Sequence, residues 1–272
     1  MSADNYDNLR QDQCFLLDMD GTFYLGDSLI DGAAEFLQTV TDQGKEYLFL
    51  TNNSSRNAVH YQEKLREMGI DVSLDRIVSS GEVTADYIRR QKPGARVYVA
   101  GTPSLEADLK QAGLTLVEKR GDNPDYAVLG FDTTLTYKKL WILHDLILEG
   151  VEYIATNPDF VCPLEEGRTM PDCGSMIELL EASTGERPLV IGKPNTLMID
   201  YISQKTGIDK QYLCMVGDRL YTDIRTALEA GIDSVAVLTG EATEEDLEET
   251  EFHPDYVLAS IKELERILGG EL

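Results

Sequence analysis

The stretch CFLLDMDGT, from Cys14 to Thr22, decides the fold class of this chain. Its first four residues are apolar, as in a buried strand, and two carboxylates, Asp18 and Asp20, follow directly. Like charges at the end of a buried strand are costly unless a divalent cation lies between them. A single aspartate at a strand end is often only a helix N-cap, but the DxDGT pattern is much more specific. We therefore expect a carboxylate pair that binds a cation.

Short apolar runs of the same kind alternate with helical patterns along the whole chain. The predicted strands are Cys14–Asp18, Glu46–Asn52, Arg96–Gly101, Tyr126–Phe131, Glu152–Asn157, Leu189–Pro194, Cys214–Asp218 and Ser234–Gly240. The predicted helices include Gly32–Gln43 and Ser55–Met68. Continuous apolar strands that alternate with helices predict parallel sheets with helices on both faces, so the fold class is α/β. In such sheets the chemistry collects at the carboxyl ends of the strands.

Three further strand ends carry candidate site residues. Thr51 and Asn52 follow an apolar run, where a hydroxyl and backbone N–H groups form a natural phosphate seat. Lys193 follows another run, and Asp218 a third, with Asp223 five residues later. The lysine can neutralise a carboxylate or hold a phosphoryl oxygen, and Asp218 can complete an oxygen-only Mg²⁺ site.

Each of these residues also has a purely structural interpretation. Asn53, Ser54 and Ser55, next to the Thr51 run, could cap the following helix. Lys193 could be a surface lysine in a turn, and Asp223 a first-turn acid favoured by the helix dipole. The combination decides between the two interpretations, because phosphoryl transfer through an aspartyl-phosphate needs a nucleophilic carboxylate, a general acid, a cation and donors around the phosphoryl oxygens.

Four segments, DMDGT, LTNNS, IGKP and GDRLYTD, resemble in that order motifs I to IV of the haloacid dehalogenase superfamily. The resemblance implies a Rossmann-like core in which Asp18 is the nucleophile and Asp20 the general acid/base. It further implies that Thr51 is the motif II phosphate ligand, that Lys193 is the motif III lysine, and that Asp223 supports Asp218. Asn52, next to Thr51, is a further candidate for substrate binding. Mg²⁺ would be held by the Asp18 carboxylate, the Asp20 backbone carbonyl and Asp218.

The spacing of the motifs identifies the type of inserted domain. Thr51 lies 33 positions after Asp18, whereas Lys193 lies 142 positions after Thr51, so a second α/β domain is inserted in the longer interval. We expect a discontinuous core of residues 1–80 and 188–272 and an inserted α/β cap of type 2, residues 81–187.

Segments of the cap interval resemble the NagD-like, p-nitrophenylphosphatase-like branch, subclass IIA. They are GFDTTLTYKKL, ATNPDFVCP and PDCGS, the last departing at Asp172 from the PGxG of many relatives. Asn157 and Asp159 are candidate substrate ligands, although a proline-rich turn with an Asx cap explains them equally well. The resemblance implies a Mg²⁺-dependent phosphomonoesterase for small metabolites such as nucleoside monophosphates or sugar phosphates, with p-nitrophenyl phosphate as generic substrate. The alternative is a catalytically silent phospho-ligand sensor or scaffold.

Composition limits the partners. Lys and Arg number 24 against 49 Asp and Glu, a formal net charge of −25, which disfavours nucleic acid and anionic membranes. The sequence has no apolar run of membrane-spanning length and no apolar signal segment, so we expect a cytoplasmic protein with reduced thiols. By the same resemblance, the cap is expected to support a homodimer.

Overall fold

The computed structural model describes residues 6–164 and 167–271. The chain divides into two compact units, which we name the core unit and the cap unit. The core unit takes in Met1–Leu50, Gln62–Ile77 and Pro194–Leu272, and the cap unit takes in Thr51–Tyr61 and Val78–Lys193. Both are α/β, as the alternation of strands and helices predicts.

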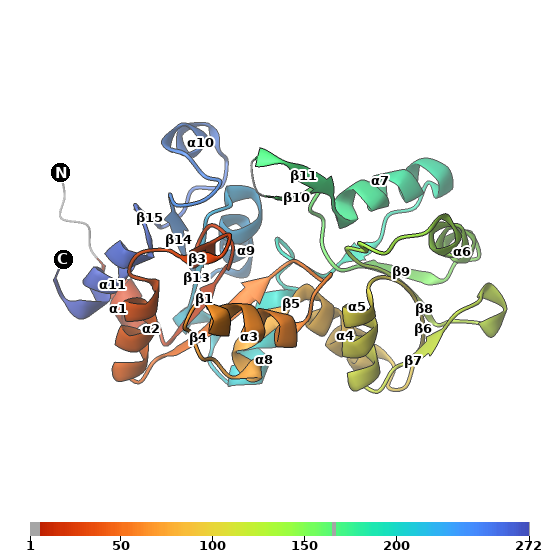
Figure 1. Ribbon diagram of the computed structural model, residues 1–272, viewed down its shortest axis with the longest axis horizontal. Helices are drawn as coiled ribbons and strands as arrows, with labels where there is room; N and C mark the ends of the chain where they lie inside the picture. The colour runs from red at the N-terminus through yellow and green to blue at the C-terminus, as the bar shows by residue number, and fades with distance from the viewer. Residues whose placement is uncertain (1–5, 165–166, 272) are drawn as a thin grey trace. The chain divides into compact units, whose positions relative to one another are not determined.

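The core unit is built on a six-stranded sheet in the order β15-β14-β13-β1-β4-β5. Its strands are β1 (Cys14–Leu17), β4 (Glu46–Thr51), β5 (Ile77–Ser79), β13 (Leu213–Gly217), β14 (Asp233–Val237) and β15 (Tyr256–Leu258). Strand β1 pairs in parallel with both β13 and β4, so segments from opposite ends of the chain lie side by side (Figure 1). All four residues of β1 are fully buried, which explains its uninterrupted apolar run.

The order of these strands creates a topological switch point. From β1 the chain continues on one side to β4 and β5, and it later fills the other side with β13, β14 and β15. The carboxyl ends of β1 and β13 therefore flank the position where open α/β sheets bind their ligands.

Helices and a short hairpin complete the elements near this sheet. The helices are α1 (Asp7–Gln11), α2 (Ala33–Asp42), α3 (Ala58–Glu67), α8 (Leu197–Thr206), α9 (Arg225–Ala230), α10 (Glu244–Glu249) and α11 (Ile261–Gly269), and the hairpin is β2 (Tyr24–Leu25) with β3 (Ser28–Leu29). Helix α11 packs against α2, and its apolar side is buried at Ile261, Leu264 and Ile267. The acidic stretch Glu241–Glu251 contains α10, whose residues are largely exposed, as expected for a solvated helix.

The cap unit has its own parallel sheet, in the order β12-β9-β8-β6-β7. Its strands are β6 (Arg96–Ala100), β7 (Thr115–Val117), β8 (Tyr126–Leu129), β9 (Glu152–Ala155) and β12 (Leu189–Val190); its helices are α4 (Ser80–Gln91), α5 (Pro103–Gln111), α6 (Tyr137–Leu148) and α7 (Cys173–Thr184). An antiparallel hairpin, β10 (Val161–Pro163) with β11 (Thr169–Pro171), precedes α7. One apolar cluster, which includes Leu143, Tyr153 and Ile177, joins α6 and α7 to the sheet.

Most predicted strands are confirmed to within one or two residues, but the prediction of a strand through Leu189–Pro194 is wrong. Only Leu189 and Val190 are in strand conformation. Ile191 and Gly192 still donate to the Ala155 and Thr156 carbonyls at 3.0 Å and 2.8 Å, but at Lys193 both backbone groups bond the Asn52 side chain instead of a neighbouring strand, which ends the pairing. None of the helices in the described part of the chain is both long and apolar enough to cross a membrane.

Candidate active site

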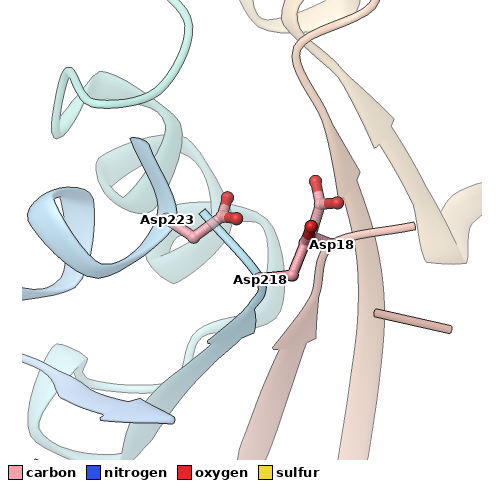
Figure 2. Close-up of side chains that lie close together, drawn as sticks. All are labelled: Asp18, Asp218 and Asp223. Carbon is pink, nitrogen blue, oxygen red and sulfur yellow. The ribbon is translucent and has the colours of Figure 1, made fainter. Parts of the chain in front are cut away.

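Three carboxylates meet at the switch point of the core sheet. Asp18 follows β1, Asp218 follows β13, and Asp223 lies in the π-helical turn η5 (Leu220–Ile224). One carboxylate oxygen from each lies within 4.8 Å of the others, and Figure 2 shows the three side chains converging on a shared space. The sequence prediction that Asp18 and Asp218 come together is confirmed.

Asp218 is almost completely buried and firmly held. Its carboxylate accepts hydrogen bonds from the Thr22 hydroxyl at 3.1 Å and the Glu241 backbone N–H at 2.8 Å. Glycine is required on both sides, because a Cβ atom on Gly21 or Gly240 would lie 2.4 Å or 2.0 Å from its Oδ2. Gly21 also has a φ of 88°, a conformation that favours glycine. The third and fourth residues after Asp18 thus build the seat of Asp218.

The environment of Asp218 disfavours a negative charge. Burial raises the pKa of Asp218 to about 7, and the charges of Asp18 and Asp223 add to the rise, while the Glu241 N–H opposes it. Such crowding of carboxylates destabilises the folded chain unless a cation compensates it. A closely spaced, oxygen-only donor set suits Mg²⁺. The cluster therefore fits the predicted cofactor, and the Asp20 backbone carbonyl as a further ligand stays a prediction.

Asp223 is placed by the π-helical turn that precedes α9. Its Oδ2 accepts from the Arg219 backbone N–H at 3.1 Å, and its side chain lies so close to Gly217 that a Cβ there would be 2.3 Å away. A π-helical turn is rare and often marks a functional site. Asp223 is therefore not the first-turn acid of an ordinary α-helix, because α9 begins only at Arg225.

Asp20 lies in the loop that leads from β1 to the β2–β3 hairpin, and it forms an isolated bridge with Tyr24. Partial burial raises the pKa of Asp20; the Lys64 ammonium opposes this rise and the Asp18 charge adds to it. Lys64 lies over the Tyr24 ring, with 4.1 Å between Nζ and the ring centroid. A raised pKa suits a group that must hold a proton before it donates it. Sequence reasoning did not identify Lys64, because nothing in its helical pattern distinguishes it from other surface lysines.

The remaining predicted residues belong to the cap unit. Thr51 is the last residue of β4, is largely buried, and accepts a hydrogen bond from the Asn53 N–H at 3.1 Å. The alternative that Asn53 to Ser55 cap the next helix is wrong, because α3 begins at Ala58 and its N-cap is Asn57, which accepts from the His60 N–H at 3.4 Å.

Lys193 is buried, with 2% of its surface exposed, so it is not a lysine in an exposed turn. Its backbone is held by the Asn52 side chain, whose Oδ1 accepts from the Lys193 N–H at 2.8 Å and whose Nδ2 donates to the Lys193 carbonyl at 2.9 Å. The structure therefore joins two predicted residues that are 141 positions apart. An ammonium buried in a protein of net charge −25 needs anionic partners.

Asn157 and Asp159 also join this group. The Asp159 Oδ2 accepts from Asn52 Nδ2 at 3.0 Å and from Asn157 Nδ2 at 3.2 Å, and Asn157 Nδ2 also donates to Asp172 at 3.0 Å. Asn157 is fully buried, and these bonds use both of its amide hydrogens. Direct contact of Asn157 or Asp159 with a substrate stays a prediction. Asp172 is a member of this network that sequence reasoning noted only as a departure from a family pattern.

Two family models match the chain. Residues 15–115 match the haloacid dehalogenase-like hydrolase model, and residues 190–264 match an HAD-hydrolase-like model. An acid sugar phosphatase of Staphylococcus epidermidis is 39% identical over 95% of this chain and 100% of its own. The chain belongs to the haloacid dehalogenase-like hydrolases.

Solved structures extend the likeness to the whole architecture. A 4-nitrophenylphosphatase from Thermotoga maritima is 48% identical, with a TM-score of 0.92 over 96% of this chain and 99% of its own. A glycerol phosphate phosphatase from Mycobacterium tuberculosis, in complex with magnesium, is 33% identical, with a TM-score of 0.86 over 93% of this chain and 76% of its own. The fold is the Rossmann-like core of this family with an α/β cap, and the chain is a phosphoric monoester hydrolase of the NagD-like branch with Mg²⁺ as cofactor.

Proposed function

We propose that this hydrolase removes phosphate from small phosphorylated metabolites, sugar phosphates first among them, through an aspartyl-phosphate on Asp18. The observation that carries the proposal is the cluster of Asp18, Asp218 and Asp223 at the switch point of the core sheet, with oxygens within 4.8 Å of one another. Sugar phosphates come first because the Staphylococcus epidermidis relative is an acid sugar phosphatase. Nucleoside monophosphates and p-nitrophenyl phosphate remain within the proposed range.

In the first half of the reaction, an Asp18 carboxylate oxygen attacks phosphorus and the bond from phosphorus to the alcohol oxygen breaks. Asp20 donates its proton to the leaving alcohol oxygen, and its raised pKa keeps that proton available. Bound at the carboxylate cluster, Mg²⁺ supplies positive charge that lets an anionic phosphoryl group approach anionic carboxylates. In this proposal Thr51, Asn52 and Lys193 position or hold the phosphoryl group.

In the second half, Asp20 takes a proton from water, whose oxygen attacks the phosphorus of the aspartyl-phosphate. The bond between phosphorus and the Asp18 oxygen breaks, so inorganic phosphate leaves and both aspartates return to their starting states. Asp218 and Asp223 take no proton in this scheme; they are the proposed metal ligand and its support.

The proposal also includes the domain boundaries, the oligomeric state and the cellular location of the protein. We infer a discontinuous core of residues 1–80 and 188–272 and a cap of residues 81–187, whose loops choose the substrate; these boundaries assign Thr51 and Lys193 to the core, although both lie in the compact cap unit. We further propose a cytoplasmic homodimer. Light scattering at micromolar concentrations tests the assembly, and a monomer at all concentrations contradicts it.

The experiment that tests the function is phosphate release from a panel of phosphomonoesters, with Mg²⁺ and then with EDTA. The panel contains sugar phosphates, glycerol phosphate, nucleoside monophosphates, pyridoxal phosphate and p-nitrophenyl phosphate. Mg²⁺-dependent release, highest for a sugar phosphate, supports the proposal. If a well-folded protein releases phosphate from none of them, the silent phospho-ligand sensor takes its place, and such a protein should bind a phosphomonoester without turnover.

A further inference from the structure

The side chain of Asn52 acts as a two-point clamp on the backbone of Lys193. It accepts a hydrogen bond from the Lys193 N–H and donates one to the Lys193 carbonyl, at 2.8 Å and 2.9 Å. The position of this buried lysine thus depends on which way the Asn52 amide faces. If the amide were reversed, its NH₂ would face the Lys193 N–H and its oxygen would face the Lys193 carbonyl, and both bonds would be lost.

Asp159 decides that orientation. Its Oδ2 accepts the second Asn52 amide hydrogen at 3.0 Å, and a reversed amide would place a carbonyl oxygen against a carboxylate oxygen. Both side chains are largely buried, with 7% of Asn52 and 8% of Asp159 exposed, so water competes poorly for these groups. A hydrogen bond to a carboxylate in such surroundings is stronger than one between neutral groups.

Asp159 is itself held by its neighbours in the cap unit. Asn157 Nδ2 donates to its Oδ2 at 3.2 Å, and the Gly174 N–H at the start of α7 donates to its carbonyl at 2.8 Å. Position 174 admits only glycine, since a Cβ there would lie 2.1 Å from the Pro158 carbonyl oxygen. The Asp159 carboxylate therefore has little freedom to turn away from Asn52.

The hydrogen bonds that Asp159 accepts do not require its negative charge. Its other oxygen, Oδ1, is buried and accepts no hydrogen bond from any residue that the structure describes. An asparagine whose amide oxygen took the place of Oδ2 could accept the same bonds without the desolvation cost of a half-paired carboxylate. A charged acceptor here is costly for stability and gains its value through the group that it orients.

We infer that Asp159 is a positioning residue that acts through Asn52 on Lys193. It fixes the Asn52 amide, and the amide fixes the backbone from which the lysine extends. The significance for activity rests on the proposed function, in which Lys193 holds the transferring phosphoryl group. The role of Asp159 is then to keep the lysine in place, not to contact the substrate.

The test compares D159L with D159N by kcat, KM and amide hydrogen exchange of the peptide that contains Lys193. D159L removes the acceptor, so we expect kcat to fall by about 10- to 100-fold with little change in KM, because the lysine acts mainly on the transition state. Exchange at the Lys193 amide should rise about 10-fold or more. D159N keeps a neutral acceptor but can also turn its NH₂ toward Asn52, so it should lie between wild type and D159L in both readouts, with kcat lower than wild type by about 3- to 10-fold.

A matched control is D108N, which removes another partly buried carboxylate of the cap unit, on α5. Burial raises the pKa of Asp108 to about 7, so a neutral amide is a mild change there. It should leave kcat and Lys193 exchange unchanged. If D159L matches wild type in both, the inference is overturned; if exchange rises while no form of the protein releases phosphate, the positional link stands and the proposed function falls.

A double-mutant cycle covers the case in which D159L does not fold. N52D sets two carboxylates against each other and removes the donor to the Lys193 carbonyl, so it should be as damaging as D159L. N52D/D159N removes that repulsion and restores one donor and one acceptor between positions 52 and 159, but it does not restore the donor to the Lys193 carbonyl, so the readout is exchange of the Lys193 amide, whose acceptor at position 52 is kept. That exchange should be at least about 5-fold slower in N52D/D159N than in N52D. Exchange as fast in the double mutant as in N52D would overturn the inference.

Discussion

The described part of the chain contains two large parallel sheets, and both carry acidic residues beyond their carboxyl ends, but the surroundings of these carboxylates differ. At the core sheet, Asp18, Asp218 and Asp223 crowd together, and the pKa of Asp218 rises. In the cap unit, Asp132 follows β8 and is also buried, but Lys139 Nζ donates to it at 2.7 Å and the Thr134 hydroxyl and N–H also donate to it. Burial alone therefore does not identify a site.

The difference between the two sheets shows which feature identifies a catalytic site when one chain contains two α/β units. The cap unit pairs Asp132 with the Lys139 ammonium, whereas the core sheet brings three carboxylates within 4.8 Å of one another, and the pKa of Asp218 rises. A topological switch point is present in both sheets, between β1 and β13 in the core and between β6 and β8 in the cap. Crowding of several carboxylates at the switch point, and not the switch point itself, distinguishes the catalytic sheet.

The largest expected effect comes from D18N. An amide of nearly the same shape is a far weaker nucleophile, so we expect kcat to fall by about 10³-fold or more. The melting temperature should not fall, because the change removes one charge from the crowded cluster. The exposed D42N on α2 is the control, and phosphate release near the wild-type level in D18N would contradict covalent catalysis by Asp18.

The second-largest effect is expected from removal of Mg²⁺. EDTA should reduce phosphate release by at least about 100-fold, and Mg²⁺ should raise the melting temperature of the wild-type protein by relieving repulsion among the carboxylates. D218N should lose most of that thermal shift while being more stable than wild type in EDTA, since the pKa of Asp218 is raised in the folded state. The same Mg²⁺ shift in D218N and wild type would place the metal elsewhere.

Much of the core site could be predicted from the sequence, because its residues directly follow apolar strands. The DxDGT segment and Asp218 needed only the rule that parallel strands end at one edge. The clamp of Asn52 on Lys193 could not be predicted, because it joins residues 141 positions apart through an amide orientation that depends on Asp159.

Short or irregular elements were missed for a related reason. The two-residue strands β2 and β3 leave no periodic pattern in the sequence. The π-helical turn η5 differs from an α-helix only in its hydrogen bonding, which tertiary packing around Asp223 decides. Local sequence patterns thus predicted the carboxylates that follow the core strands. The hydrogen-bond partners of Asn157 and Asp159 depend on long-range contacts, which such patterns do not contain.

K139M tests the cap side of the comparison. It leaves the fully buried Asp132 carboxylate without its cation, which should cost about 3 kcal/mol of unfolding free energy. K139M/D132N should recover most of that loss, because no buried charge then remains. Urea unfolding at about pH 7.5 measures both variants. A loss in K139M below about 0.5 kcal/mol would show that Asp132 is not compensated by Lys139, and would remove the contrast with the core sheet.

The smallest expected effect concerns Asp12, at the amino end of β1 and thus at the opposite edge of the core sheet from the site. Burial and the nearby Asp233 charge raise the pKa of Asp12 from 3.8 to about 7, against the attraction of Lys45, while Asp255 adds to the rise. Between these two pKa values the folded chain keeps a proton that the unfolded chain has released. Stability from this group is therefore greatest below about pH 4 and is lost as the pH rises to about 7.

D12N should remove this dependence. We expect its unfolding free energy to change less between about pH 4.5 and 7.5 than that of wild type, by on the order of 1–2 kcal/mol, and to exceed wild type at the upper end of that range. The exposed E63Q on α3 is the control and should follow the wild-type curve. Parallel curves for D12N and wild type would mean that the buried carboxylate is as easily ionised as an exposed one. Asp218, whose pKa is raised to about 7, would then be distinguished by its titration from this carboxylate at the opposite edge of the same sheet.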